Sequence, residues 1–283
     1  MESYLGEELE KSTMSEKFCA DDADVTFRSA DGVLFRIHTL NLKAHAEGFP
    51  PPEFLESSEI VPLTETASTL DVLFRFIYPS RHPDLEHVDF AVLEPLAEAA
   101  EKYQVYSAMS VCRIYMKATL PLHPEAIMSY ASRHDYPEIM ALAAPPLLKR
   151  PLEDVASKMP LALLAPWVQY YGKWNHVLHG ALSFFVSKGT APIPLPPISG
   201  FGSTRPIARS IVISCPGCHA SLENRIINIM AKLGAGVTSL QDLDSVFNLG
   251  FPPCCDKGAV QIQVWRSSIE VDIRSIPNFT TFV

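Results

Sequence analysis

Apolar and polar residues alternate in two short segments near the start of the chain. The first segment places Val25 and Phe27 on one face, and the second does the same with Phe35 and Ile37. The pair Asp31-Gly32 lies between them and is typical of a tight turn. This pattern predicts a β-hairpin, followed by a short helix that Thr39 would cap and that would carry Leu40, Leu42 and Lys43.

The stretch from residue 59 to residue 116 predicts one further strand and three helices. Ile60 to Leu63 is a short apolar strand, and Ser68 with Asp71 has the spacing of a capping box. Apolar residues then recur at helical intervals until Pro79, where the first helix should stop. The second helix carries Leu93, Leu96, Ala97, Ala100 and Tyr103, and the third, capped by Ser107, carries Ala108, Met109, Cys112, Tyr115 and Met116.

Two of these stretches resemble one known family. The run "FIY…AAEKYQV…C" and the opening "DADVTFRSADGVLFRIHTLNL" closely resemble the BTB/POZ domain, over roughly residues 24–118. Two segments depart from the family pattern: Ala44-His45-Ala46-Glu47 stands where a serine is usual, and "GFPPPEF" replaces a compact helix-turn. The resemblance implies an α+β fold, in which a small sheet is flanked by helices.

Proline and glycine divide the chain into five parts. The predicted organisation is a flexible lead-in (1–22), a BTB/POZ-like domain (23–119), a helical extension (120–188), a Pro/Gly-rich linker (189–206) and a small Cys-bearing α+β tail (207–283). Within the extension we expect helices to begin at or beside Pro124, Pro137 and Pro151, followed by an amphipathic helix over residues 161–185. In the tail we expect strands at 211–213, 261–265 and 269–273 and helices at 222–233 and 240–247. This order of parts resembles the expanded BTB proteins of mushroom-forming (basidiomycete) fungi.

Composition narrows the classes of function. The chain has 23 Lys and Arg against 32 Asp and Glu, a formal net charge of −9, and no basic stripe that would favour nucleic acid. No apolar run approaches the ~20 residues of a membrane helix, and the acidic N-terminus lacks the apolar core of a secretory signal. We therefore expect no membrane partner, a cytoplasmic or nuclear location, and reduced cysteines. The acids Asp21, Asp22 and Asp24 are expected to be solvated.

The C-terminal cysteines are the one cluster with metal-ligand spacing. Cys215 and Cys218 form a CxxC pair that, with His219 and one or both of Cys254 and Cys255, predicts a zinc site. A strand, a Cys-Pro-Gly-Cys turn and a helix would also suit a thiol-redox centre of thioredoxin type. A third interpretation is a set of reduced, partly buried thiols. No phosphate loop or nucleophile elbow is present, so no enzymatic activity is expected apart from that redox alternative.

The resemblance also implies partners. BTB domains commonly form homodimers, here through the segment before Asp24 and the helix from Thr39 to Ala46. Many act as substrate adaptors for cullin-type ubiquitin ligases, and Phe54-Leu55-Glu56 matches the hydrophobic-x-Glu element of those that bind cullin. The sequence thus predicts a protein–protein interaction module with an unidentified client. The alternatives are the thiol-redox enzyme centred on Cys215 and a transcriptional regulator whose tail binds DNA.

Overall fold

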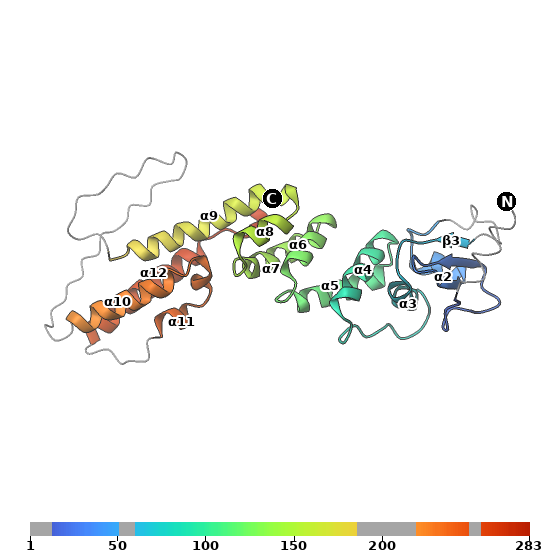
Figure 1. The fold of residues 1–283 in the computed structure, drawn as a ribbon, viewed down its shortest axis with the longest axis horizontal. Helices are drawn as coiled ribbons and strands as arrows, with labels where there is room; N and C mark the ends of the chain where they lie inside the picture. Colours follow the sequence, from blue (N-terminus) through green and yellow to red (C-terminus); the bar gives the residue numbers. More distant parts are fainter. Residues whose placement is uncertain (1–12, 51–59, 186–218, 249–255) are drawn as a thin grey trace. The chain divides into compact units, whose positions relative to one another are not determined.

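The structure is a computed structural model of mixed α and β content, mostly helical with one small sheet (Figure 1). It divides into two compact units, residues 1–143 and residues 144–283, which are taken separately below. The residues that the structure describes are 13–50, 60–185, 219–248 and 256–283.

The sheet of the first unit has three strands in the order β2-β1-β3. The hairpin forms as predicted: β1 (Val25–Arg28) and β2 (Leu34–Ile37) are antiparallel, with Phe27 opposite Phe35. The turn uses Gly32 at a φ of 87°, which glycine adopts without steric cost. The predicted third strand, β3 (Ile60–Pro62), pairs in parallel with β1.

Helices complete this unit, and the prediction places them correctly. In chain order they are α2 (Thr39–His45), α3 (Ala67–Arg75), α4 (Phe90–Lys102), α5 (Tyr106–Thr119), α6 (Pro124–Arg133) and α7 (Pro137–Leu147), the last of which continues past residue 143. Pro124 and Pro137 begin α6 and α7 as expected, because proline suits the first helical position.

The predicted caps are wrong by one or two residues. The N-cap of α3 is Thr66, whose hydroxyl lies 3.0 Å from that of Ser68, so Ser68 forms no capping box with Asp71. Ser107 lies inside α5 and donates to the carbonyl of Phe76 instead. In both helices the hydroxyl expected to cap the helix contacts another group: Ser68 contacts the hydroxyl of Thr66, and Ser107 donates to the carbonyl of Phe76. The sequence pattern alone does not indicate these partners.

The core of the first unit is centred on the ring of Phe74. Four other rings, those of Phe18, Phe27, Phe35 and Phe49, have their centroids 5.4–6.1 Å from it. Phe18 belongs to the predicted lead-in, yet its side chain is buried. Residues 13–22 are therefore part of the folded unit.

The loop after α2 meets the end of α4 at a very short distance. The N–H of Gly48 donates to the carbonyl of Tyr103 at 2.9 Å, and the ring of Phe49 stacks on that of Tyr103 at 4.2 Å. A Cβ on Gly48 would lie 2.5 Å from the carbonyl oxygen of Lys102 and 2.6 Å from the Cα of Tyr103. Only glycine fits here without moving one of the two backbones.

The second unit is built around one long helix, α9 (Leu161–Ser183). It contacts α10 (His219–Leu233), α12 (Asp256–Arg274) and two short 3-10 helices, η3 (Val237–Gln241) and η4 (Phe279–Thr281). The unit also contains α8 (Leu152–Lys158) and α11 (Leu243–Phe247). Within the described ranges, no helix combines the length and the apolar character needed to cross a bilayer.

The strands predicted at 261–265 and 269–273 are wrong, because both segments belong to the single helix α12. The buried side chains Ile262, Trp265 and Ile269 are spaced by three and four residues, which is one face of a helix. Val271, which an alternating strand would have buried, is exposed. The strand predicted at 211–213 lies outside the described residues.

The described part of the C-terminal region shares its core with α9. The indole N–H of Trp265 donates to the carbonyl of Ala181 at 2.9 Å, and its ring stacks on that of Phe184. Farther along α9, the ring of Phe279 meets those of Trp167 and Tyr170 edge-on. The predicted extension and tail therefore contribute to one core, which is larger than the tail alone could form.

Replacing Gly48 by alanine should destabilise the first unit. The new methyl group would overlap the backbone of Lys102 and Tyr103, and overpacking of this kind costs about 1–3 kcal/mol. Gly180→Ala is the matched control, because its Cβ meets open space on α9 and should stabilise the helix by about 0.5–1 kcal/mol. Thermal unfolding of the full chain measures both, and equal effects would contradict the close approach.

Candidate functional site

Most of the site residues predicted from the sequence lie outside the described residues. This applies to Phe54-Leu55-Glu56 and to Cys215, Cys218, Cys254 and Cys255. His219 begins α10, but its side chain is also outside the described part. The structure does describe the residues on either side of the Phe54 segment: Phe49 packs on Tyr103, and Ile60 pairs with Thr26 of the central strand. Both ends of this segment are therefore attached to the core of the first unit.

The helix expected to form the dimer face, α2, has one buried and one exposed apolar side. Leu42 points into the core, whereas Leu40 is 77% exposed. Ala44, four residues after Leu40, is also exposed and lies on the same face of the helix. The exposed face of α2 thus presents a large apolar side chain to solvent.

The start of α2 is fixed by Asp24, which lies immediately before β1. Thr39 is the first residue of the helix rather than its cap, and both its N–H (2.7 Å) and its hydroxyl donate to the carboxylate of Asp24. Partial burial alone would raise the pKa of Asp24, but these two hydrogen bonds outweigh it and hold the pKa below its usual value. Asp24 therefore performs the capping role that the sequence assigned to Thr39.

All three acids before β1 are exposed to solvent, as expected, but each also has a polar partner. Besides Asp24, Asp21 pairs with Arg36 at 2.8 Å and Asp22 lies 3.3 Å from Nε2 of His38. The other ring nitrogen of His38 lies 2.9 Å from the hydroxyl of Tyr78. These contacts connect the acidic segment to β2 and α2, and no sequence signal indicated them.

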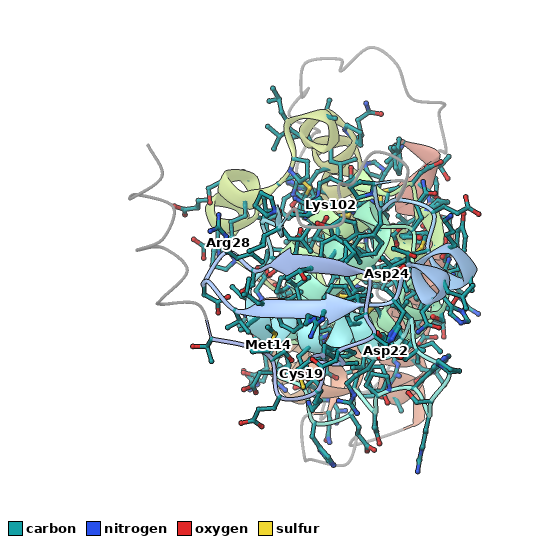
Figure 2. The ribbon with its side chains drawn as sticks, turned by 90° about the vertical axis from the view of Figure 1, so that its right-hand side faces the viewer. Met14, Cys19, Asp22, Asp24, Arg28 and Lys102 are labelled. Atoms are coloured by element: carbon teal, nitrogen blue, oxygen red, sulfur yellow. The ribbon has the colours of Figure 1, made fainter. Side chains whose placement is uncertain are left out.

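Residues 13–18 cover the outer edge of β2. The N–H of Ser15 donates to the carbonyl of Leu34, and the N–H of Leu34 donates to the carbonyl of Thr13, both at 2.8 Å. Met14 forms an isolated parallel bridge with Leu34 and leaves its own side chain exposed. Figure 2 shows Met14 and Cys19 along this edge, with Asp24 at the start of β1, on the side of α2. The segment satisfies an edge that would otherwise be open to pairing.

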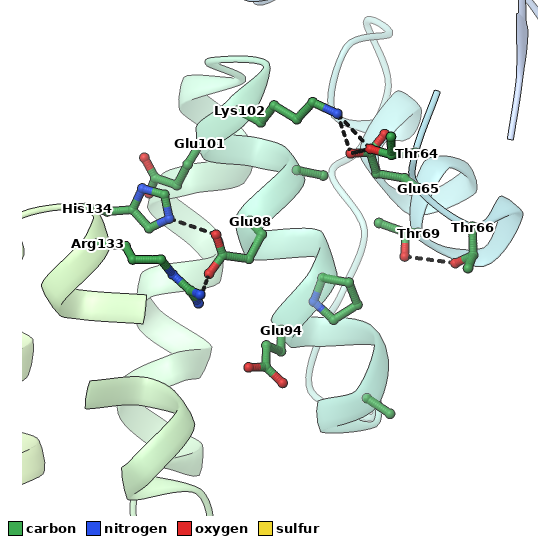
Figure 3. Close-up of a pocket in the computed structure, with 13 residues that line it drawn as sticks. Thr64, Glu65, Thr66, Thr69, Glu94, Glu98, Glu101, Lys102, Arg133 and His134 are labelled. Carbon is green, nitrogen blue, oxygen red and sulfur yellow. Dashed lines mark hydrogen bonds and ion pairs between the residues drawn. The ribbon is translucent and has the colours of Figure 1, made fainter. Parts of the chain in front are cut away.

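A polar pocket of about 710 Å³ lies between the loop before α3, the helix α4 and the end of α6 (Figure 3). Glu98 of α4 accepts hydrogen bonds from Arg133 at 2.5 Å and from His134 at 2.9 Å. Across the pocket, Glu65 is paired with Lys102 at 2.8 Å. Glu94 also lines the pocket and has no partner among the described residues. Ion pairs that connect neighbouring elements therefore form part of the pocket lining.

One carboxylate of α4 holds two tyrosines of the following helices. Glu101 accepts hydrogen bonds from the hydroxyls of Tyr130 (2.7 Å) and Tyr136 (2.6 Å), and the guanidinium of Arg113 lies over the ring of Tyr136. Burial, followed by the hydrogen bond to Glu101, raises the pKa of Tyr136 to about 12 and raises that of Tyr130 further. Both tyrosines therefore stay neutral donors, and the cluster fixes α6 and the start of α7 on α4.

The described cysteines do not form a reactive pair. Cys112 is buried on α5, and burial raises the pKa of its thiol to about 12, so the thiolate is disfavoured. Cys19 is exposed, and its Sγ lies 3.6 Å from the carbonyl of Glu16. Across the described ranges, no three side chains of the metal-ligating types are gathered around one point.

Removing the carboxylate of Glu101 should destabilise the first unit markedly. In Glu101→Ala the hydroxyls of the buried Tyr130 and the half-buried Tyr136 lose their acceptor, a loss of about 1–3 kcal/mol. Glu94→Ala is the control on the same helix and should change the free energy of unfolding by less than about 0.5 kcal/mol. Denaturant unfolding of both variants makes the comparison. A destabilisation of the same size in the two would show that the tyrosine cluster contributes nothing beyond helix propensity.

No model of a protein family matches the chain, and no curated protein matches its sequence.

Proposed function

We propose that this chain is a protein–protein interaction protein of BTB/POZ type that self-associates through its N-terminal segment and α2. The observation that carries the proposal is the exposed Leu40 on a helix whose start is fixed by Asp24. At the outer edge of β2, the segment before β1 also leaves the side chain of Met14 exposed. A rigid helix with an outward apolar side chain suits a partner surface better than a mobile one does, because less conformational entropy is lost on binding.

The arrangement of the first unit supports the family resemblance at the level of architecture. Its sheet is small, its first two strands form a hairpin, and helices follow the third strand, as the resembled family requires. In that family the segment before the first strand and the first helix form the dimer face. Here these two elements are linked by the contacts of Asp24 with Thr39 and of Asp22 with His38. We infer that they act together as one surface.

The more specific proposal is that the chain serves as a substrate adaptor for a cullin-type ubiquitin ligase. Phe54-Leu55-Glu56 would be the cullin contact, by resemblance to the hydrophobic-x-Glu element of other BTB proteins. What supports this is the attachment of both flanks, through Phe49 and Ile60, to the core.

Self-association is tested by replacing Leu40 with glutamate. A charge at the centre of a dimer face should raise the dissociation constant at least about tenfold, which corresponds to about 1.4 kcal/mol. Ile114→Glu is the control, because Ile114 is an exposed apolar residue of the same unit on α5. Analytical ultracentrifugation of the full chain over a concentration series measures both. A parent protein that stays monomeric, or a Leu40→Glu variant that associates like the parent, would contradict the proposed dimer face.

Cullin binding is tested by affinity capture from the native source with proteomic identification. The parent should recover a cullin, and Phe54→Ala combined with Glu56→Arg should lose it, because the proposed contact is then removed. Leu40→Glu should still recover the cullin, since it alters the other proposed surface. If the parent recovers only itself and proteins unrelated to ubiquitin ligases, the adaptor function is refuted and the interaction module remains.

A further inference from the structure

We propose that the polar pocket on α4 binds a lysine or arginine side chain from an extended segment of a partner protein. Such a site rests on the function proposed above, an interaction protein with an unidentified client, and it gives the chemistry of the client segment. The pocket lies entirely within the first unit and has a volume of about 710 Å³. This volume is in the range of protein sites that enclose a small ligand or a few peptide side chains.

Short side chains on one face of α4 form the floor of the pocket. Ala91, Pro95 and Ala99 follow one another at intervals of four residues, so they lie on the same side of the helix. From Ala91 to Lys102 the lining covers about 16 Å of helix, at a rise of about 1.5 Å per residue. An extended polypeptide covers this length with about five residues. A peptide segment therefore matches the length of the pocket better than a small free amine does.

The lining of the pocket carries more negative than positive charge. Four glutamates face one lysine and one arginine, which leaves two negative charges uncompensated when His134 is neutral. The glutamates come from the loop before α3 and from successive turns of α4, and they are Glu65, Glu94, Glu98 and Glu101. A hollow lined by an excess of one charge concentrates groups of the opposite charge.

The two cations of the lining are already paired, which argues against an anionic ligand. Lys102 lies 2.8 Å from Glu65, and Arg133 lies 2.5 Å from Glu98. Burial alone would raise the pKa of Glu65, but hydrogen bonds, first among them that from Lys102, outweigh it and hold the pKa below its usual value. An anion would have to separate one of these pairs and leave a glutamate without its cation.

The other two glutamates keep an uncompensated negative charge. Glu94 has no partner among the described residues. Glu101 accepts hydrogen bonds from Tyr130 and Tyr136 through the same oxygen, Oε1, and both donors are neutral hydroxyls. A cationic side chain can therefore enter beside Glu94 without displacing an existing contact, and its hydrogen bond to a carboxylate is of the strong, charge-assisted type.

The wall opposite α4 adds neutral acceptors. Figure 3 shows Glu94 and Glu98 on α4, with Thr66 and Thr69 across from them. The two threonine hydroxyls lie 3.1 Å apart, and each can accept a hydrogen bond as well as donate one. An ammonium or guanidinium group, which only donates, suits this combination of carboxylates and hydroxyls.

Direct binding of labelled peptides to the full chain tests the site. The probes are fluorescein-labelled peptides of glycine, serine and alanine that are identical except for a central lysine, arginine, glutamine or glutamate. Fluorescence anisotropy should show that the lysine and arginine peptides bind at least about threefold more tightly than the glutamine peptide, as expected for one ion pair at a half-exposed site. The glutamate peptide should bind most weakly, because it meets the uncompensated negative charge.

A charge-neutralising variant locates the contact. Glu94→Gln should weaken binding of the lysine peptide about threefold to fivefold and leave binding of the glutamine peptide unchanged, because the pair exists only when both partners are charged. Glu86→Gln is the matched control: Glu86 is exposed in the loop before α4, outside the pocket lining, and its loss changes the net charge of the chain equally. This control should leave both dissociation constants unchanged, and thermal unfolding should show that both variants fold like the parent.

The possible failures are distinguishable from one another and from failure of the α2 dimer face. If no peptide binds, or if the lysine and glutamine peptides bind equally, the proposed recognition is overturned. Equal weakening by Glu94→Gln and Glu86→Gln would overturn it as well, since the net charge of the chain and not the pocket would then attract the peptide. If spermidine binds in a Glu94-dependent manner while the peptides do not bind, the pocket takes a free polyamine and the partner segment is refuted. Leu40→Glu should bind the lysine peptide like the parent, so self-association and peptide binding are measured separately.

Discussion

The first unit depends on the packing of four phenylalanine rings around a fifth, that of Phe74. Each ring comes from a different segment: the N-terminal stretch, the two strands of the hairpin, the loop after α2, and α3. Because the core gathers side chains from segments that are distant in sequence, it also fixes where each segment enters and leaves the domain. The loop after α2 is the clearest case, since Phe49 can reach Phe74 only because Gly48 allows the backbone to touch the end of α4. That contact holds one end of the segment that contains Phe54-Leu55-Glu56, and the attachment of Ile60 to β1 holds the other.

The polar contacts of the first unit act between neighbouring helices rather than on a substrate. Glu98 and Glu101 lie less than one turn apart on α4, and both accept donors from the α6–α7 region. Glu65 accepts hydrogen bonds from Lys102 and Tyr103 at the end of α4. These hydrogen bonds are directional, whereas contacts between apolar side chains are not. They therefore help to fix how α6 and the start of α7 pack on α4.

In the second unit α9 has two different sides, one buried and one exposed. The buried side holds Trp167, Tyr170 and Trp174 against segments that follow it much later in the chain. The other side is almost without charge, although it is exposed.

The sequence by itself determined the elements whose signals are local. The hairpin followed from alternation and the Asp31-Gly32 turn, β3 from a short apolar run, and the starts of α6 and α7 from Pro124 and Pro137. Only the tertiary structure decided features that depend on distant partners. Residues 261–273 satisfy both an alternating pattern and a helical one, and contact of Trp265 with Ala181 and Phe184 selects the helix. The cap of α2 comes from Asp24, fifteen residues before Thr39, and Glu101 finds its tyrosines 29 and 35 residues later. A periodic pattern records which side of an element is apolar, but the partner that covers that side is set by chain segments that the pattern does not contain.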